Sequence, residues 1–169
     1  MFKKIIKAAF SGLILFLAKS SLGRFIFREI LQAAMAESHA IKKGKNTYFF
    51  SIASPLLRLR AETFLTKEPE TLEWIDRMND GSVLWDIGAN VGIYSIYAAV
   101  SKRANVIAFE PSIFNLEFLA RNINLNDVAD RVSIVPMPLS NKTQLNEMRI
   151  TSLDWGGALS TFGENYDGN

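Results

Sequence analysis

The sequence lacks cysteine altogether and contains one histidine, His39, among its 169 residues. Without cysteine, this chain has no disulfide framework, no thiolate metal site and no cysteine nucleophile. A single histidine excludes a multi-histidine metal site, and a Ser-His-Asp hydrolase would have to use His39 itself. No acid or nucleophile is arranged around His39 in the sequence, so we expect a surface residue without a catalytic role. We predict no metal site.

The hydrophobic and charged shares of the composition, 49% and 21%, are those of a globular protein. The length suggests one domain with a sizeable core. Residues 1–60 contain eleven Lys and Arg and two acids, whereas residues 61–169 contain eight basic residues and fifteen acids. The resulting balances of +9 and −7 indicate two regions with different surroundings. Aromatic and basic residues are not interleaved on one predicted surface, so we do not expect binding to nucleic acid.

An apolar stretch at residues 8–18 follows three lysines, Lys3, Lys4 and Lys7. A helix over this stretch rises about 16 Å, whereas the hydrocarbon core of a bilayer is about 30 Å thick. A transmembrane helix is therefore disfavoured. A signal peptide fits the lysines and the length of the stretch, but the cleavage-like residues 34–36 lie too far downstream.

The same segment fits an amphipathic helix, because apolar residues recur at helical spacing and the lysines lie mainly off that stripe. The stripe consists of Phe2, Ile5, Ile6, Ala9, Leu13, Phe16 and Leu17. Such a helix fits peripheral contact of residues 1–20 with an anionic membrane, which would place a cytoplasmic protein on the inner face of that membrane. It also fits packing on its own domain or on the second subunit of a homodimer.

Residues 1–45 are expected to form a basic arm of two helices, the second of which ends at residues 42–45. Residues 46–52 are aromatic and β-branched, and residues 57–63 alternate between apolar and polar side chains. With Ser54 and Pro55 as the turn between them, these segments predict a β-hairpin. A helix that begins at Pro69 completes residues 46–80. The core domain is expected at residues 81–169.

A strand, a glycine loop and a helix are expected in succession at residues 82–101. Residues 82–87 are a short apolar run typical of a buried parallel strand. The loop that follows contains Gly88, Ala89, Asn90 and Gly92. Gly88 permits a sharp turn and a close ligand, and Asn90 tolerates a positive φ where many such loops carry a second glycine. This is the nucleotide-cradling arrangement of doubly wound α/β folds.

Two further strands, at residues 105–109 and 131–136, continue the alternation of strand and helix. The order predicts an α/β fold with a parallel sheet and right-handed crossovers. Glu110 follows the second strand, 18 residues after Gly92, where an acid in such folds accepts hydrogen bonds from ribose hydroxyls. Residues 146–150 are expected to form one more strand.

The loop favours one of two cofactors by its charge. A dinucleotide loop has the spacing G-x-G-x-x-G, with a pyrophosphate at the helix N-terminus. Here Gly88 and Gly92 are separated by three residues, and Asp86 precedes both. The Asp86 carboxylate opposes a pyrophosphate and suits the amino group of a methionine moiety, so S-adenosyl-L-methionine is favoured. A nicotinamide-dependent oxidoreductase is the alternative.

Longer motifs resemble the FkbM family of S-adenosylmethionine-dependent methyltransferases. They are Lys-Glu-Pro-Glu-Thr at residues 67–71, Trp-Asp-Ile-Gly-Ala-Asn-Val-Gly-Ile-Tyr-Ser at residues 85–95 and Phe-Glu-Pro-Ser at residues 109–112. The resemblance, which covers about residues 62–162, implies a Rossmann-like class I methyltransferase fold. It also implies methylation of a hydroxyl group on a small molecule or glycan, such as a sugar or a secondary metabolite.

By position, the resemblance assigns the methionine end of the cofactor to Asp86, Gly88, Ala89, Asn90 and Gly92. It assigns the ribose to Glu110. Glu68 and Thr71 would close over the cofactor, with simple helix capping as the alternative. Asn115 and Asn122 also fit the family pattern, and we expect them on a helix surface or in a cap. The general base is not implied by any residue.

Members of the family have, after the region of resemblance, a fourth strand that ends in Lys-Ile-Asp. This sequence does not contain that motif. The resemblance therefore implies the N-terminal part of a longer enzyme, inactive by itself. It also implies a free edge on the strand at residues 82–87, so poor solubility or dimerisation through that edge is expected. A third hypothesis is a non-catalytic, membrane-associated module that keeps a relict Rossmann-like fold.

Overall fold

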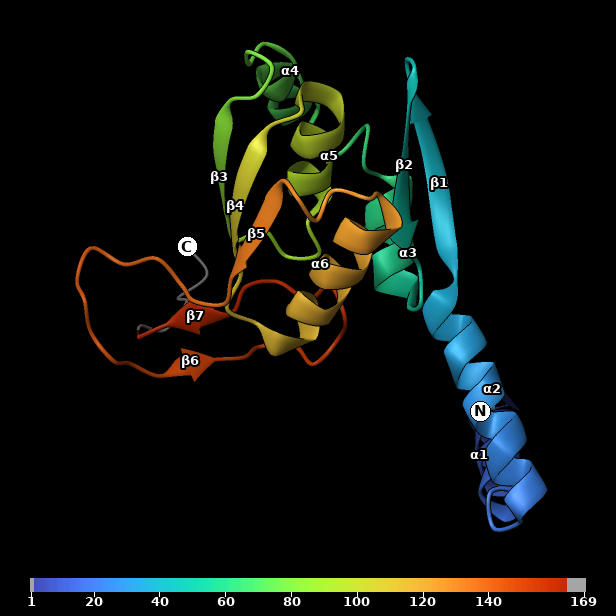
Figure 1. Ribbon diagram of the computed structural model, residues 1–169. Coiled ribbons are helices and arrows are strands. Elements are labelled where there is room, and N and C mark those ends of the chain that lie inside the picture. The colour runs from blue at the N-terminus through green and yellow to red at the C-terminus, as the bar shows by residue number, and fades with distance from the viewer. Residues whose placement is uncertain (1, 164–169) are drawn as a thin grey trace. The chain divides into compact units, whose positions relative to one another are not determined.

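The computed structural model describes residues 2–163 and divides into two compact units, which meet in the sequence between Glu37 and Ser38 (Figure 1). The first unit contains helices α1 (Phe2–Leu17) and α2 (Ser21–Ala36). In the described residues, no single helix has the length and hydropathy of a membrane span. Phe10–Leu17 and α2 together, bent by 119°, meet those criteria by length and composition.

The second unit begins with a β-hairpin, of which only the strand predicted at residues 46–52 was expected. Strand β1 (Ser38–Lys43) pairs antiparallel with β2 (Asn46–Ser51), and Gly44 turns between them with a φ of 60°. The prediction that the second helix runs to residues 42–45 is therefore wrong, because this turn places residues 38–45 in the hairpin. His39, expected at the surface in or after that helix, lies half-buried on β1.

Residues 57–63, predicted as the second hairpin strand, belong instead to helix α3 (Pro55–Glu62) and the residue that follows it. The Ser54 hydroxyl accepts a hydrogen bond from the Leu57 amide at 3.2 Å, and Pro55 occupies the first turn. Both are strong helix-start features. The alternation also places Leu57 and Ala61 four residues apart, so α3 buries both on one face. In this short segment, the alternation of apolar and polar residues that predicts a strand therefore also places apolar residues on one face of a helix.

The parallel α/β core agrees with the prediction. Its helices and strands are α4 (Pro69–Asp76), β3 (Val83–Ile87), α5 (Ile93–Lys102), β4 (Asn105–Phe109), α6 (Ile113–Leu125) and β5 (Val132–Val135). The sheet has the order β3-β4-β5 with parallel pairing throughout, so Trp85 lies beside Ile107 and Ile107 beside Ser133. The carboxyl ends of these strands meet at one edge, where the loops that follow them come together.

The hydrophobic core lies between this sheet, its helices and the hairpin. Aromatic rings of Tyr48, Phe64 and Tyr97 meet there with centroids 5.3–5.5 Å apart. At the hairpin turn, Lys43 Nζ donates to the Asp76 carboxylate at 2.8 Å and also contacts the Tyr97 hydroxyl. Burial and the adjacent Asp76 raise the pKa of Tyr97 to about 12. These contacts hold the hairpin on α4 and α5.

One face of the sheet is bare in the described residues. Two successive right-handed crossovers in the same direction place α5 and α6 on the same side of β3–β5 (Figure 1). On the opposite side, Val83, Trp85 and Ile87 are 62%, 59% and 63% exposed. The remaining strands, β6 (Met148–Arg149) and β7 (Thr161–Phe162), pair only with each other. The strand predicted at residues 146–150 is thus two residues long, and β3 is an edge strand.

We expect this bare face to cause self-association. Trp85→Glu should weaken self-association at least about tenfold, since burying a large apolar side chain contributes about 1.5–3 kcal/mol. Trp74→Glu is the matched control, because Trp74 is 56% exposed and belongs to helix α4 and not to the sheet. Sedimentation velocity over a range of protein concentrations measures both. Equal effects of the two substitutions would contradict association through the sheet.

Candidate functional site

The glycine loop between β3 and α5 is held by the end of the neighbouring strand. The amides of Gly88 and Ala89 both donate to the Phe109 carbonyl, at 2.9 and 3.0 Å. Asn90 has a φ of 52°, which is the positive φ that the sequence predicts asparagine to tolerate at this position. Gly92 has a φ of 82°, and a Cβ on it would lie 2.4 Å from the Leu119 side chain. Only glycine therefore lets α5 begin so close to α6.

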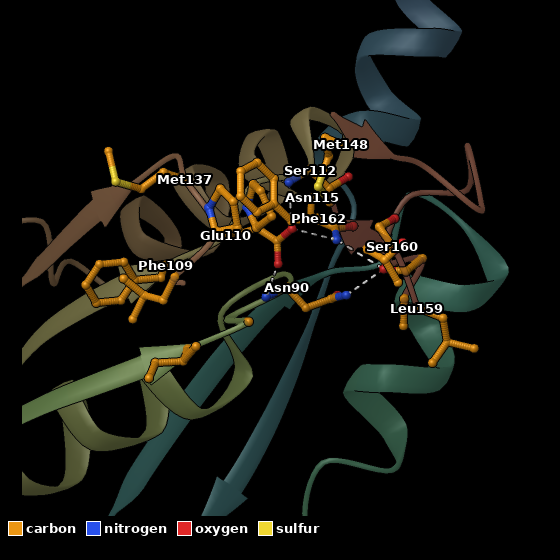
Figure 2. Close-up of a pocket in the computed structure, with 18 of the residues that line it drawn as sticks. Asn90, Phe109, Glu110, Ser112, Asn115, Met137, Met148, Leu159, Ser160 and Phe162 are labelled. Carbon is orange, nitrogen blue, oxygen red and sulfur yellow. Dashed lines mark hydrogen bonds between the residues drawn. The ribbon is translucent and has the colours of Figure 1, made fainter. Parts of the chain in front are cut away.

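The Glu110 carboxylate organises this loop from the adjacent strand end. Its Oε2 accepts a hydrogen bond from the Asn90 amide at 2.8 Å. Its Oε1 accepts from the Ser112 amide at 2.8 Å and from Asn115 Nδ2 at 3.3 Å. Figure 2 shows the carboxylate among these donors, and the residue is only 5% exposed. Glu110 therefore joins the glycine loop to the first turn of α6, a position also favoured by the helix dipole.

Asp86, near the end of β3, faces the start of α5. Its Oδ2 accepts a hydrogen bond from the fully buried Ser95 hydroxyl at 2.5 Å. Burial raises the pKa of the Asp86 carboxyl, and the negative charge of Glu110 raises it further, while the Ser95 hydrogen bond opposes both effects. The structure thus places two carboxylates, Asp86 and Glu110, on either side of the loop.

Glu68 and Thr71, predicted to close over the cofactor, border the same loop from the start of α4. Glu68 is the N-cap residue of α4, but its side chain makes no capping hydrogen bond. It contacts Lys67 at 3.7 Å instead and acts electrostatically on the hydroxyl of Tyr94 of α5. Burial and this carboxylate raise the pKa of Tyr94. Glu68, Thr71 and Asp86 line one common cleft.

A distant segment, residues 152–160, lies over the loop. Asn90 Nδ2 donates to the Gly157 carbonyl at 2.7 Å, and Arg60 Nε donates to the Gly156 carbonyl at 2.7 Å. Burial lowers the pKa of Arg60. Arg60 lies in the segment predicted as the second hairpin strand, and the sequence gave no indication of either contact. The Asn90 side chain therefore holds this segment while its backbone forms the loop.

Asn115 and Asn122 are buried, so the expectation of surface or capping positions is wrong. Asn115 is 3% exposed, accepts from the Gly156 amide at 3.1 Å and donates to the Gly157 carbonyl at 3.1 Å. Asn122 is fully buried; it accepts from the Ser51 amide at 2.8 Å and donates to the Val91 carbonyl at 2.7 Å. Their spacing with the buried Leu119 is the signal that places both on the inner face of α6.

Two clefts flank the glycine loop at the carboxyl edge of the sheet. The first, of about 590 Å³, is lined by residues that include Glu110, Ser112, Asn115, Met137, Leu139 and Ser140. The second, of about 430 Å³, is lined by residues that include Arg60, Lys67, Glu68, Thr71, Asp86 and Tyr94. Ile87, Gly88, Asn90 and Ala158 border both. Clefts of this size suit small ligands. Within the part of the chain that the structure describes, no three His, Asp or Glu residues gather as a metal site.

No family model matches the sequence, and no curated protein matches it. Solved structures similar to this one include TYW2 of P. horikoshii in complex with MeSAdo, precorrin-6y C5,15-methyltransferase of Geobacter metallireducens and the tRNA m1G37 methyltransferase of M. jannaschii. Their identities are 26%, 31% and 23%, with TM-scores of 0.43, 0.37 and 0.40. They cover 60%, 41% and 58% of this chain. The chain covers 36%, 37% and 28% of them, so it spans about a third of their length.

Proposed function

We propose that this protein binds S-adenosylmethionine at the glycine loop and functions in the methylation of a hydroxyl group. The observation that carries the proposal is the placement of two carboxylates on one side of the cleft beside the loop. Asp86 and Glu68 line it together, and both lie near the start of α5. A pyrophosphate at that position would meet two carboxylates, whereas the amino group of a methionine moiety would be attracted by them.

The remaining groups around the loop also fit this cofactor. Arg60 and Lys67 line the same cleft and provide positive charge for a carboxylate. The larger cleft on the other side of the loop, beside Glu110, has room for a nucleoside. The adenosine would lie there, and the methionine end would lie against Asp86.

The cofactor supplies a methyl group that its sulfonium already activates. The chain has the task of binding the cofactor, orienting the methyl group toward the acceptor and excluding water. The S–C bond breaks as the O–C bond forms, and the hydroxyl proton must leave to a base. A hydroxyl acceptor on a sugar or another small molecule is proposed from the resemblance to the FkbM family.

Titration calorimetry with S-adenosylhomocysteine tests the proposal directly. We expect saturable binding to the wild-type chain, and no displacement of the bound ligand by NAD. Binding of NAD without binding of S-adenosylhomocysteine would overturn the proposal and favour the oxidoreductase alternative.

A pair of glycine substitutions shows where the ligand binds. Gly88 and Gly81 have φ values of 79° and 77°, and a Cβ at either position meets no atom within 4 Å. Gly88→Ala and Gly81→Ala should therefore both cost about 1–2 kcal/mol of stability through backbone strain. Only Gly88 lines the clefts, so only Gly88→Ala should weaken S-adenosylhomocysteine binding, by about tenfold or more. Equal affinities of the two variants would place the ligand elsewhere.

A further inference from the structure

The N-terminal unit presents a large apolar surface to its surroundings. Helix α2 has no buried residue. The described side chains of α1 are exposed as well, with Leu15 at 68% and Phe16 at 69%. Leu22, Phe25 and Ile30 of α2 are 68%, 53% and 62% exposed. Monomeric proteins rarely expose contiguous apolar surface of this extent without a partner.

The apolar surface surrounds the end of α1 instead of following one stripe. At about 100° per residue, Phe10, Ile14 and Leu17 project to one side of the helix, whereas Leu15 and Phe16 project to the other. All five are at least 40% exposed. A partner helix would cover one side only. A lipid environment can contact all sides.

Helix α2 has an apolar face and a basic face. Leu22, Ile26 and Ile30 recur every four residues and share one face, while Arg24 and Arg28 lie on the opposite face. Residues 1–28 contain six Lys and Arg and no acid, and Glu29 and Glu37 are the only acids in residues 1–60. Apolar surface with a strong excess of positive charge beside it is complementary to an anionic lipid headgroup layer.

The turn between the helices satisfies its own backbone groups. Arg24 Nη1 donates to the carbonyls of Ala18 and Lys19, at 3.3 and 2.8 Å. The Ser20 hydroxyl donates to the Leu17 carbonyl at 3.0 Å and accepts from the Gly23 amide at 2.9 Å. Such internal pairing stabilises a helix turn where water is scarce, as it is in the acyl region of a bilayer.

We propose that α1 and α2 bind an anionic lipid bilayer, with the apolar side chains in the acyl boundary and the basic side chains among the headgroups. This inference is independent of the proposed function, since it rests on the first unit alone. It predicts that binding needs both the charge and the apolar surface, so each can be removed separately.

Co-sedimentation of the full chain with vesicles tests the charge. We expect binding to phosphatidylcholine vesicles that contain phosphatidylserine, much weaker binding to phosphatidylcholine alone, and release as salt is raised. Lys19→Ser with Arg28→Ser should lower the partition coefficient about 25-fold, since each basic residue near an anionic surface contributes about fivefold. Lys142→Ser with Arg149→Ser, at exposed positions of the second unit, should change nothing.

Leu13→Asp tests the apolar surface and should lower the partition coefficient at least about tenfold. Leu145→Asp is the control, because Leu145 is fully exposed on the second unit, and Leu13 is 53% exposed, so neither change disturbs the core. Unchanged melting curves check this. Equal binding to both vesicle types, or no binding to either, would overturn the proposal. So would loss of a dimer in Leu13→Asp with unchanged binding to vesicles, which would assign the surface to a second copy.

Discussion

Replacing Glu110 with glutamine is expected to lower the free energy of unfolding by about 2–4 kcal/mol. The Glu110 carboxylate accepts from the amides of Asn90 and Ser112 and from the Asn115 side chain. Glutamine has only one acceptor oxygen, so in either orientation its NH₂ group faces a buried N–H donor. At least one donor is then left without a partner in a site that is 5% exposed, and the charge assistance to the others is lost.

Glu117→Gln is the matched control for this prediction. Glu117 lies on α6, whose first turn Glu110 contacts, and forms an exposed pair with Arg121 at 2.8 Å. Such pairs contribute only about 0–1 kcal/mol. Urea unfolding of both variants gives the comparison. If Glu117→Gln were to cost as much as Glu110→Gln, the Glu110 contacts would have no special weight in holding the loop.

The same variant separates two roles of Glu110 in binding. The sequence predicts a contact with ribose, which would spare ligands that lack adenosine. The contacts with the loop and α6 predict that Glu110→Gln also weakens free methionine, because the loop borders both clefts. Calorimetric titration with S-adenosylhomocysteine and with methionine distinguishes a ribose contact from support of the loop.

The core was predictable because its strands are short, mainly apolar runs, and each of the first two is followed by a helical pattern. The structure of residues 57–63 was not predictable in this way, because Leu57 and Ala61 fit the alternation of a strand as well as one face of a helix. The local signal that decides between them is Ser54-Pro55, a helix start that also fits a turn. The hairpin strand at residues 38–43 alternates weakly and carries charges, so its pairing depends on the core that it covers.

The site was predictable as far as it is local in sequence. The loop, Asp86 and Glu110 lie within one strand-helix-strand unit, whose geometry is general. The segment at residues 152–160 reaches the loop across more than 60 residues, through Asn90 and Gly157, and no periodic pattern encodes such a contact. A polar side chain such as Asn115 is also ordinarily exposed on a helix. Only the packing of α6 places it inside.

Asp86→Asn is expected to change stability and binding in opposite directions. Burial raises the pKa of Asp86 in the folded protein, so the folded chain binds this proton more tightly than the unfolded chain does. Ionisation at neutral pH therefore costs stability, and the cost disappears as pH falls below the unfolded pKa of about 4. Asparagine is neutral and can still accept from the Ser95 hydroxyl. The variant should be more stable than wild type at pH 7, with the difference vanishing in acid.

Binding should weaken in the same variant, because the charge that attracts the methionine amino group is lost. A charge-assisted hydrogen bond contributes about 1.5–3 kcal/mol, or roughly 10- to 150-fold in affinity for S-adenosylhomocysteine. Asp80→Asn is the control, since Asp80 is exposed, pairs with Lys102 and lines neither cleft. Thermal melts at several pH values and calorimetry measure the two effects. A carboxylate that binds the ligand stabilises the complex and, because it is buried, destabilises the free protein. A loss of stability with unchanged affinity would therefore show that Asp86 is a structural residue of the turn.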